Sequence, residues 1–308
     1  MQQALAKPLT DEQLSKMASR MALKVKIFGL LTVAFATLAL CPRIIIMDVP
    51  ILIILASLQF CSPALAFLFV FLTKRSRDEL KKIIGNNILS AILADLFNVN
   101  HYSPTAHIVK EAVTRAGLIE TKKWEKIKGS DLVEGTYRGV GISFSNIHLF
   151  DKKWTGTGKD VTIFRGQWLI LHLAKDIPHG LKLIERGFDN KTAKSDIETE
   201  NMEFNKKFEI IASDPHTAFY VLTPHFMEYI MSADRQADAR TYINIRGKEI
   251  HIALHSGRDL FDVSKNKMRH VKMIPALRAQ MRRELRYITG IIDEFLLNEN
   301  LFDGKEEK

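Results

Sequence analysis

The stretch at residues 27–73, IFGLLTVAFATLALCPRIIIMDVPILIILASLQFCSPALAFLFVFLT, carries only two charged side chains, Arg43 and Asp48. It contains two apolar runs, joined by a segment that includes Pro42 and Pro50 and therefore disfavours a continuous helix. Because about 20 apolar residues of helix cross the hydrocarbon core of a bilayer, the stretch predicts a transmembrane helical hairpin. The first run is short, so the sequence leaves open whether it fully spans the bilayer or is re-entrant.

Basic residues flank both ends of the predicted hairpin. Lys24 and Lys26 precede it, and Lys74 and Arg75 follow it. Lys and Arg close to a membrane span are retained on the cytoplasmic side, so we expect a multi-pass protein of the plasma membrane with both termini in the cytoplasm. A cleaved signal peptide is the competing interpretation of the first run. Against it, the 26 residues before that run are long for the basic n-region of a signal peptide, and a second apolar run follows almost at once.

The rest of the chain divides into three predicted segments. Residues 1–26 have apolar side chains at helical spacing and predict a cytoplasmic amphipathic arm. Residues 74–129 predict a helical connector, and residues 130–308 are long enough for a cytoplasmic domain with a core of its own. The net charge of +9 favours anionic partners, of which a lipid surface fits best. Nucleic acid is not expected, because the sequence has none of the motifs that bind it.

From Ser130 onward the sequence is rich in short runs of Val, Ile, Thr and aromatic residues, separated by glycines. Few helices intervene between these runs, so we predict a mainly antiparallel α+β domain with a long C-terminal helix. The last two runs are expected to form a hairpin across Gly247 and Lys248. The predicted strands are 132–137, 140–149, 161–164, 167–173, 181–185, 208–212, 218–222, 241–246 and 249–254, and the predicted helices are 78–97, 103–116, 224–233 and 274–298.

Cysteine and histidine positions restrict the chemistry. The only two cysteines, Cys41 and Cys61, lie in the predicted hairpin, which excludes a disulfide framework, a cysteine-ligated zinc site and a thiol nucleophile in the C-terminal domain. His251 and His255 are four residues apart and would share one face of a strand. They leave a membrane-tethered hydrolase or metal-dependent enzyme open as an alternative, but spacing identifies no third ligand. We therefore expect no metal, no cofactor and no catalytic residue.

The predicted C-terminal helix is amphipathic, with an apolar stripe and four arginines beside it. One interpretation is a helix packed on the core with a solvated basic face. The other is a binding face for phosphate headgroups or an acidic partner, in which each charge near an anionic leaflet contributes about 1 kcal/mol. The candidate residues for anionic lipid or partner binding are Arg278, Arg282, Arg283 and Arg286.

The segment at residues 200–228, ENMEFNKKFEIIASDPHTAFYVLTPHFME, resembles the central signature of the bacterial "domain of unknown function 3137" family. Upstream, TIFRGQWLIL resembles a strand, a turn and another strand of the same family. The matching residues are Phe164-Arg165-Gly166, Glu203-Phe204, Phe208, Asp214-Pro215, Ala218, Leu222-Thr223-Pro224, Met227 and Glu228.

The resemblance implies a bacterial inner-membrane protein with an N-terminal hairpin, a cytoplasmic domain and a LemA-type membrane protein as a possible partner. It brings no activity and no catalytic residues. Physically, the signature predicts structural roles: packing of Phe204 on Phe208, and a turn at Asp214-Pro215. It also predicts a helix start at Thr223-Pro224 and a hairpin turn at Arg165-Gly166 with an exposed guanidinium. The resulting hypothesis is a membrane-anchored adaptor, scaffold or sensor.

Overall fold

Two compact units make up the computed structural model of this protein. Unit 1 consists of Met1–Ile88 and Val263–Leu277, and unit 2 consists of Leu89–Asp262 and Arg278–Lys308. The structure describes residues 11–40, 49–151, 160–187, 197–261 and 274–302.

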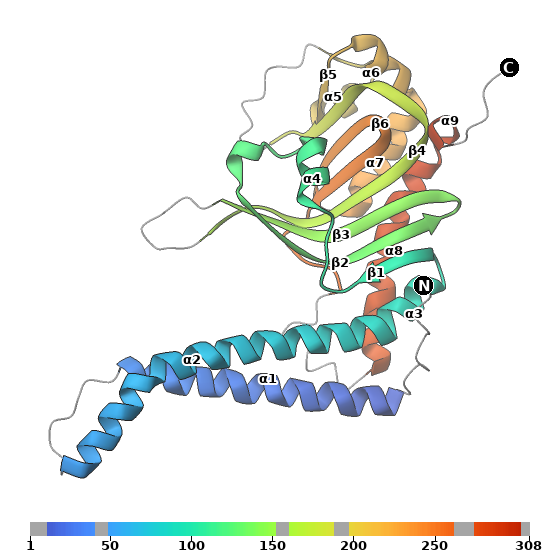
Figure 1. Cartoon of the computed structure of the whole chain (residues 1–308). Helices are drawn as coiled ribbons and strands as arrows, with labels where there is room; N and C mark the ends of the chain where they lie inside the picture. Colours follow the sequence, from blue (N-terminus) through green and yellow to red (C-terminus); the bar gives the residue numbers. More distant parts are fainter. Residues whose placement is uncertain (1–10, 41–48, 152–159, 188–196, 262–273, 303–308) are drawn as a thin grey trace. The chain divides into compact units, whose positions relative to one another are not determined.

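Unit 1 contains two long helices that lie side by side (Figure 1), α1 (Asp11–Leu40) and α2 (Val49–Ile84). Phe69 of α2 contacts two rings of α1, with centroid distances of 6.1 Å to Phe28 and 5.6 Å to Phe35. Within the described residues, no helix is long and apolar enough to cross a membrane. The predicted transmembrane hairpin is therefore unconfirmed.

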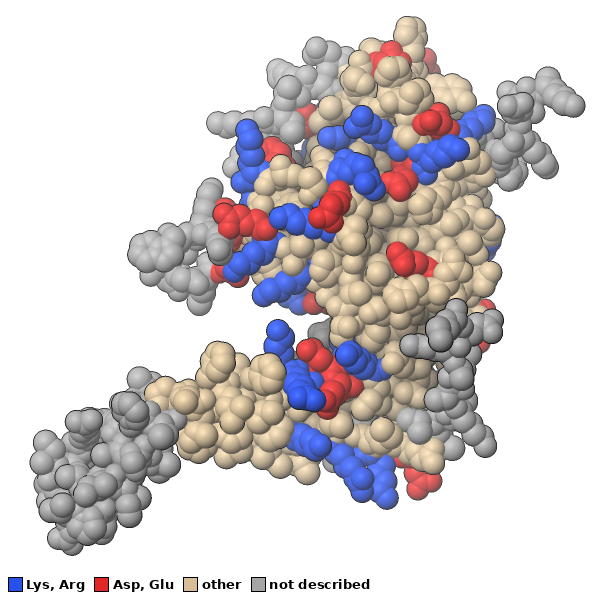
Figure 2. Space-filling model, in the orientation of Figure 1, with Lys and Arg blue, Asp and Glu red and all other residues tan. Residues whose placement is uncertain are grey.

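A group of exposed apolar side chains covers part of both helices of unit 1. Figure 2 shows that part of the helix pair carries no Lys, Arg, Asp or Glu on the face in view. Large exposed apolar patches on proteins mark surfaces that bind a membrane or another protein. We call this group the apolar surface of unit 1; it consists of Leu23, Ile27, Leu30, Val33, Phe67, Leu68, Val70 and Phe71.

Unit 2 is built on a six-stranded sheet in which every described strand pair is antiparallel. The strand order is β1-β2-β3-β4-β5, and β6 pairs with β4. The prediction of an α+β protein with a mainly antiparallel sheet and a C-terminal helix is thus confirmed. The strands are β1 (Asn98–Ser103), β2 (Lys126–Tyr137), β3 (Val140–Asp151), β4 (Val161–Glu185), β5 (Phe208–Ala212) and β6 (Arg240–His255).

Strand β4 is 25 residues long and organises the sheet. Its first part lies between β3 and β6, since Leu171 pairs with Ile142 and with Ile250. Its last part lies between β5 and β6, since Leu183 pairs with Ile210 and with Ile243. Between these parts the β4–β6 register shifts, and such irregularities bend a strand. Figure 1 shows β4 curving around the helix α4.

Helices cover both faces of this sheet (Figure 1), with α4 (Lys110–Ala116) on one face and α7 (Pro224–Ala237) and α8 (Ile274–Leu296) on the other. The latter two helices pack together through Phe226 and Phe295, whose ring centroids are 6.0 Å apart. The remaining helices are η1 (Gly85–Leu89), α3 (Ser90–Ala94), η2 (Thr121–Lys123), α5 (Met202–Lys207), α6 (Pro215–Val221) and α9 (Glu299–Phe302).

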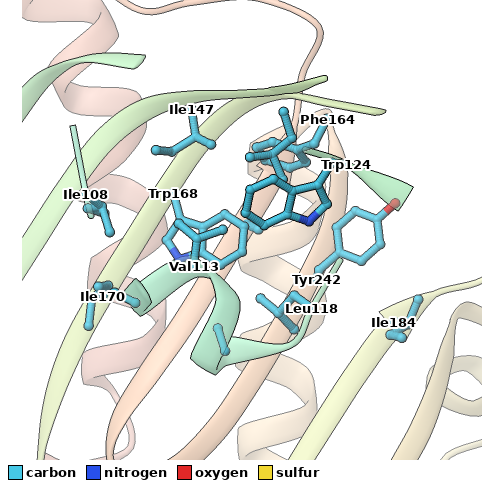
Figure 3. Close-up of a cluster of buried hydrophobic side chains, with 14 residues drawn as sticks. Ile108, Val113, Leu118, Trp124, Ile147, Phe164, Trp168, Ile170, Ile184 and Tyr242 are labelled. Atoms are coloured by element: carbon cyan, nitrogen blue, oxygen red, sulfur yellow. The ribbon is translucent and has the colours of Figure 1, made fainter. Parts of the chain in front are cut away.

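An aromatic cluster joins α4 to the sheet. Figure 3 shows Val113 and Trp168 close together, with Trp124 and Phe164 beside them. The Phe164 and Trp168 rings meet edge to face at 5.8 Å, a favoured geometry for aromatic pairs. This cluster fixes α4, and the loop that follows it, against one face of the sheet.

Three local predictions are wrong. The predicted strand at 218–222 is helix α6, because the Asp214 carboxylate caps it by accepting hydrogen bonds from the His216 and Thr217 amides at 3.2 and 3.0 Å. The predicted hairpin at 241–254 is the continuous strand β6, in which Gly247 has φ +60° but does not reverse the chain. The predicted turn at Arg165-Gly166 lies inside β4.

The predicted helix at 103–116 is correct only in its second half. Residues up to Ser103 belong to strand β1, and helix α4 begins at Lys110. The Ser103 hydroxyl accepts a hydrogen bond from the Ala106 amide at 3.2 Å, so it caps a turn and not a helix. Gly117 ends α4 with φ +57°, the left-handed conformation that a C-terminal glycine provides.

Candidate ligand-binding site

The face of the sheet that carries α4 also holds a pocket of about 930 Å³, which we call the main pocket. Most of its lining is apolar, and these side chains come from the loop after α4 and from strands β4, β5 and β6. Ligand sites are typically 300–1,000 Å³ in volume with apolar walls and a few polar groups. The apolar lining residues are Leu118, Ile119, Ile163, Ile184, Ile211 and Tyr242.

Strand register explains why these residues meet. Ile184 lies directly opposite Tyr242 in the β4–β6 ladder, and Lys182 lies opposite Asn244. Because side chains alternate along a strand, Ile184 and Lys182 share one face, while Leu183 points to the face that α7 and α8 cover. The main pocket therefore passes from apolar walls to polar ones along two adjacent strands.

Three cationic side chains line hollows that adjoin the main pocket at Lys182. Lys182 lines both the main pocket and a hollow of about 410 Å³, which it shares with Arg115 and Arg246. A third hollow, of about 480 Å³, is also lined by Arg115 and Arg246. We call Arg115, Lys182 and Arg246 the basic cluster. Figure 2 shows Lys and Arg side chains, with acidic ones among them, on the face of unit 2 that carries α4.

Negative charge near the basic cluster is sparse. The Lys182 ammonium donates a hydrogen bond to the neutral Gly117 carbonyl at 3.0 Å, and no carboxylate of the described residues lies within 4 Å of it. Burial, and then the nearby Arg246 charge, lower the pKa of Lys182. Arg115 has a loose contact of 3.8 Å with Glu249. The cluster is therefore arranged to receive an anion.

Asn244 is the most unusual polar residue of the site. It is 3% exposed, and its Nδ2 donates to the Ala116 carbonyl at 2.6 Å. Its Oδ1 is buried and has no hydrogen-bond partner. An unpaired buried acceptor costs about 1–3 kcal/mol, and most such atoms in proteins are paired. Asn244 lines both hollows of the basic cluster, where a ligand donor could reach this oxygen.

The histidine pair does not form a metal site with open ligand positions. The Trp168 indole, which can only donate, donates a hydrogen bond to Nδ1 of His251 at 3.2 Å. The Nε2 of His251 must then carry the ring proton, which it donates to Glu249 at 3.0 Å. Both nitrogens of His251 are thus occupied. Burial lowers the pKa of His251, so the ring is neutral near pH 7.

His255 lies on the same face of β6 and lines the main pocket. Its ring contacts the Phe164 ring edge to face at 5.4 Å, and burial lowers its pKa. Among the described residues, no group of three His, Cys, Asp or Glu could hold a metal ion. The alternative of a metal-dependent enzyme built on this pair gains no support from the geometry.

The predicted basic residues of the C-terminal helix lie on α8, outside the pocket. Arg282, Arg283 and Arg286 are exposed and Arg278 is half-buried, whereas Leu285 of the same helix is buried. Their role in binding anionic lipid or a partner stays a prediction.

The signature residues have structural roles. Arg165 forms two hydrogen bonds with the Asp259 carboxylate, at 3.1 and 3.0 Å, and this pair fixes the segment after β6. The Phe204 and Phe208 rings are buried and 5.1 Å apart, as predicted. Thr223 caps α7 by accepting a hydrogen bond from the Phe226 amide at 3.3 Å, also as predicted. Arg165 was expected in an exposed turn, but it is half-exposed and held in an ion pair within a strand.

Sequence reasoning missed Lys182, Asn244, Arg246 and Tyr242. These residues are brought together by strand register between segments 60 or so positions apart, which no local motif encodes. The one sequence signal near them is the Arg246-Gly247-Lys248 run, which was interpreted as a turn.

The fold and pocket define an α+β protein with a ligand-sized hollow on one face of an antiparallel sheet. Residues 162–297, which include β4, β6 and α8, match the family described as "Protein of unknown function (DUF3137)". This match confirms, over these residues, the resemblance that the signature predicted.

Two further comparisons add little. The crystal structure of the mycobacterial trehalose monomycolate transport factor A, TtfA, is similar at 11% sequence identity and a TM-score of 0.34. The match covers 66% of this chain and 95% of that chain. A similarity at this level supports no conclusion about the present protein. No curated protein matches the sequence.

Proposed function

We propose that this protein is a membrane-associated binding protein whose unit 2 takes up an amphipathic molecule in the main pocket. The observation that carries the proposal is a hollow of about 930 Å³ with mostly apolar walls, which shares Lys182 with the adjoining hollow of the basic cluster. Its volume lies within the usual range of ligand sites. The apolar part of the molecule would lie against Leu118, Ile184 and Tyr242, and its polar end would face Lys182.

Membrane association is the second part of the proposal. The eight side chains of the apolar surface of unit 1 are between 45% and 76% exposed, and water disfavours such a patch. We propose that residues 27–73 insert into the bacterial inner membrane with both termini in the cytoplasm, because they carry only two charges and have basic flanks. Alkaline extraction of native membranes should leave the full-length chain in the pellet. Its release into the soluble fraction would contradict membrane insertion.

The arginines of α8 are proposed to face anionic headgroups. Three exposed arginines on one helix would contribute about 1 kcal/mol each near an anionic leaflet. Replacing Arg282 and Arg286 with Glu should weaken binding to vesicles that contain phosphatidylglycerol. A matched control, Arg235→Glu with Arg186→Glu, changes the charge equally at two other exposed positions of unit 2. Equal vesicle binding by the two double variants would refute a specific role for α8.

An adaptor or sensor role would follow if the bound molecule altered an interaction with another protein. The family resemblance suggests a LemA-type membrane protein as that partner. Crosslinking of the full-length chain in native membranes, followed by identification of the captured proteins, tests this suggestion. Capture of a LemA-type protein would support it, and reproducible recovery of the chain alone would contradict it.

The pocket itself is tested with a neutral fluorescent monoacylglycerol and the full-length protein in nanodiscs. Wild type should bind the probe in proportion to protein, above empty nanodiscs. Ile211→Glu places a carboxylate at a half-buried wall of the pocket, close to Lys182, and should abolish this increment, because a charged group in the wall disfavours contact with the apolar part of the probe. Leu296→Glu is the control, since Leu296 is also half-buried but lies on α8. Equal probe binding by both variants and wild type would reject the pocket.

A further inference from the structure

The hollows of the basic cluster, which adjoin the main pocket at Lys182, have the geometry of a built subsite. Lys182 and Asn244 face each other across the β4–β6 ladder, and Arg246 follows Asn244 on the same face. Gly180 makes room for the Arg246 side chain, since a Cβ there would lie 3.3 Å from Arg246 Cδ. Because Gly180 has no side chain, the aliphatic part of the Arg246 side chain can lie across the sheet beside Lys182.

The charges of this subsite are arranged to hold an anion. Lys182 uses one of its three donors on the Gly117 carbonyl, and among the described residues no carboxylate pairs with Lys182 or Arg246. An ammonium and a guanidinium at one end of an apolar pocket match the oxygens of a phosphate group, which accepts charge-assisted hydrogen bonds from both.

Asn244 adds a second requirement for the ligand, which the cationic side chains do not impose. Its buried Oδ1 is an amide oxygen and can only accept a hydrogen bond, while Nδ2 donates to the Ala116 carbonyl. A ligand that pairs this atom must carry a donor, such as a hydroxyl group, close to its anionic group. The subsite therefore calls for phosphate acceptors and a hydroxyl donor in one headgroup.

We propose that Lys182, Arg246 and Asn244 bind a phosphoglycerol headgroup whose acyl chain occupies the main pocket. The phosphate lies against Lys182 and Arg246, Arg115 adds positive charge from α4, and the glycerol hydroxyl donates to Asn244 Oδ1. This inference rests on the proposed function and specifies the ligand class of the same site.

The test compares binding of three probes to the full-length protein in nanodiscs. The probes are a short-chain monoacylglycerol, the matching monoacylglycerol phosphate, and glycerol phosphate without an acyl chain. We expect the monoacylglycerol phosphate to bind at least tenfold more tightly than either of the others, because hydrogen bonds to charged groups contribute more than neutral ones. Equal affinity of glycerol phosphate and the acylated phosphate would reject a lipid source and overturn the proposal.

Two perturbations locate the headgroup. Arg246→Gln at the exposed guanidinium should cost about tenfold in affinity for the phosphate probe and leave the neutral probe unchanged. The control Arg235→Gln removes one exposed charge on α7 and should change neither. On wild type, the 2-deoxy analogue of the phosphate probe should bind several-fold more weakly, because it leaves Asn244 Oδ1 unpaired.

The outcomes separate the two proposals. If Arg246→Gln binds the phosphate probe as wild type does, or if the 2-deoxy analogue binds equally well, the headgroup assignment is wrong, while binding of the neutral probe still supports the pocket. If wild type binds neither acylated probe, the proposed function itself fails.

Discussion

Replacing Asn146 with alanine should destabilise unit 2 by about 4 kcal/mol. Asn146 is a buried residue of β3 whose side chain ties the sheet to the segment after β6. Its Nδ2 donates to Asp131 at 3.0 Å and to the Leu260 carbonyl at 2.9 Å, and its Oδ1 accepts from the Leu260 amide at 2.8 Å. Gln167 adds a weaker bond at 3.4 Å.

The magnitude follows from these bonds. The two bonds to Leu260 contribute about 1 kcal/mol each, and the bond to the Asp131 carboxylate about 2 kcal/mol. The variant also leaves the backbone N–H and C=O of Leu260 buried without this partner, so water does not replace the two lost hydrogen bonds. The Asp131 carboxylate still accepts a hydrogen bond from the Ser130 hydroxyl at 2.7 Å, so it retains one partner in the variant. About 4 kcal/mol is a large share of the 5–15 kcal/mol that stabilises a typical domain.

Urea unfolding followed by tryptophan fluorescence measures the effect, since Trp124 and Trp168 lie in the core of unit 2. The midpoint should fall with an unchanged slope. Asn100→Ala is the control, because Asn100 is exposed on β1 and should change stability by less than about 0.5 kcal/mol. Asn146→Asp should be worse than Asn146→Ala at neutral pH, since it places a second carboxylate beside Asp131. A loss below about 1 kcal/mol for Asn146→Ala would refute the role assigned to this network.

Two further predictions concern buried charge and pH. Lys207→Met should cost about 2 kcal/mol in urea unfolding, because it leaves the buried Asp234 carboxylate without its cationic partner; the hydrogen bond from Lys207 to Asp234 also raises the pKa of Lys207. A neutral result would show that the pair adds nothing. Stability should also fall as pH decreases below about 6.5, because the folded state lowers the pKa of His251 and the unfolded chain binds the proton more readily. His251→Gln should flatten this dependence, with a residual slope from His148 and His255, whose pKa values burial also lowers; an unchanged slope would contradict the assignment.

The sequence predicted features that short-range chemistry determines. Strand β5 was predicted with its observed bounds, because Phe208–Ala212 is a compact run bounded by a turn. Thr223 was identified as a helix cap because capping requires only its own side-chain hydroxyl. The antiparallel arrangement followed from the scarcity of helices between the strands. Each of these inferences depends on neighbours a few residues away.

Continuity of the long strands could not be predicted in this way. Pro178 and Gly180 in β4, and Gly247 in β6, are residues that interrupt strands in isolation. In the structure Gly247 pairs with Ile177, next to Pro178, and the β4–β6 register shifts on both sides of this pair. Two irregular segments therefore accommodate each other, and the strands continue on either side. A single segment gives no sign of this compensation.

The composition of the α4 face argues that its pocket is functional. Helix α4 has only seven residues, so it covers part of the face, and the adjacent wall carries apolar Ile184 and Tyr242 beside Lys182 and Asn244. A purely structural solution would extend the helix or replace the polar pair with apolar residues, since an unpaired buried acceptor and an uncompensated cation both reduce stability. Sites that violate these rules in natural proteins are expected where a ligand completes the interactions. The same residues that weaken the fold are those that would recognise an anionic amphiphile, which is why the headgroup test addresses the function directly.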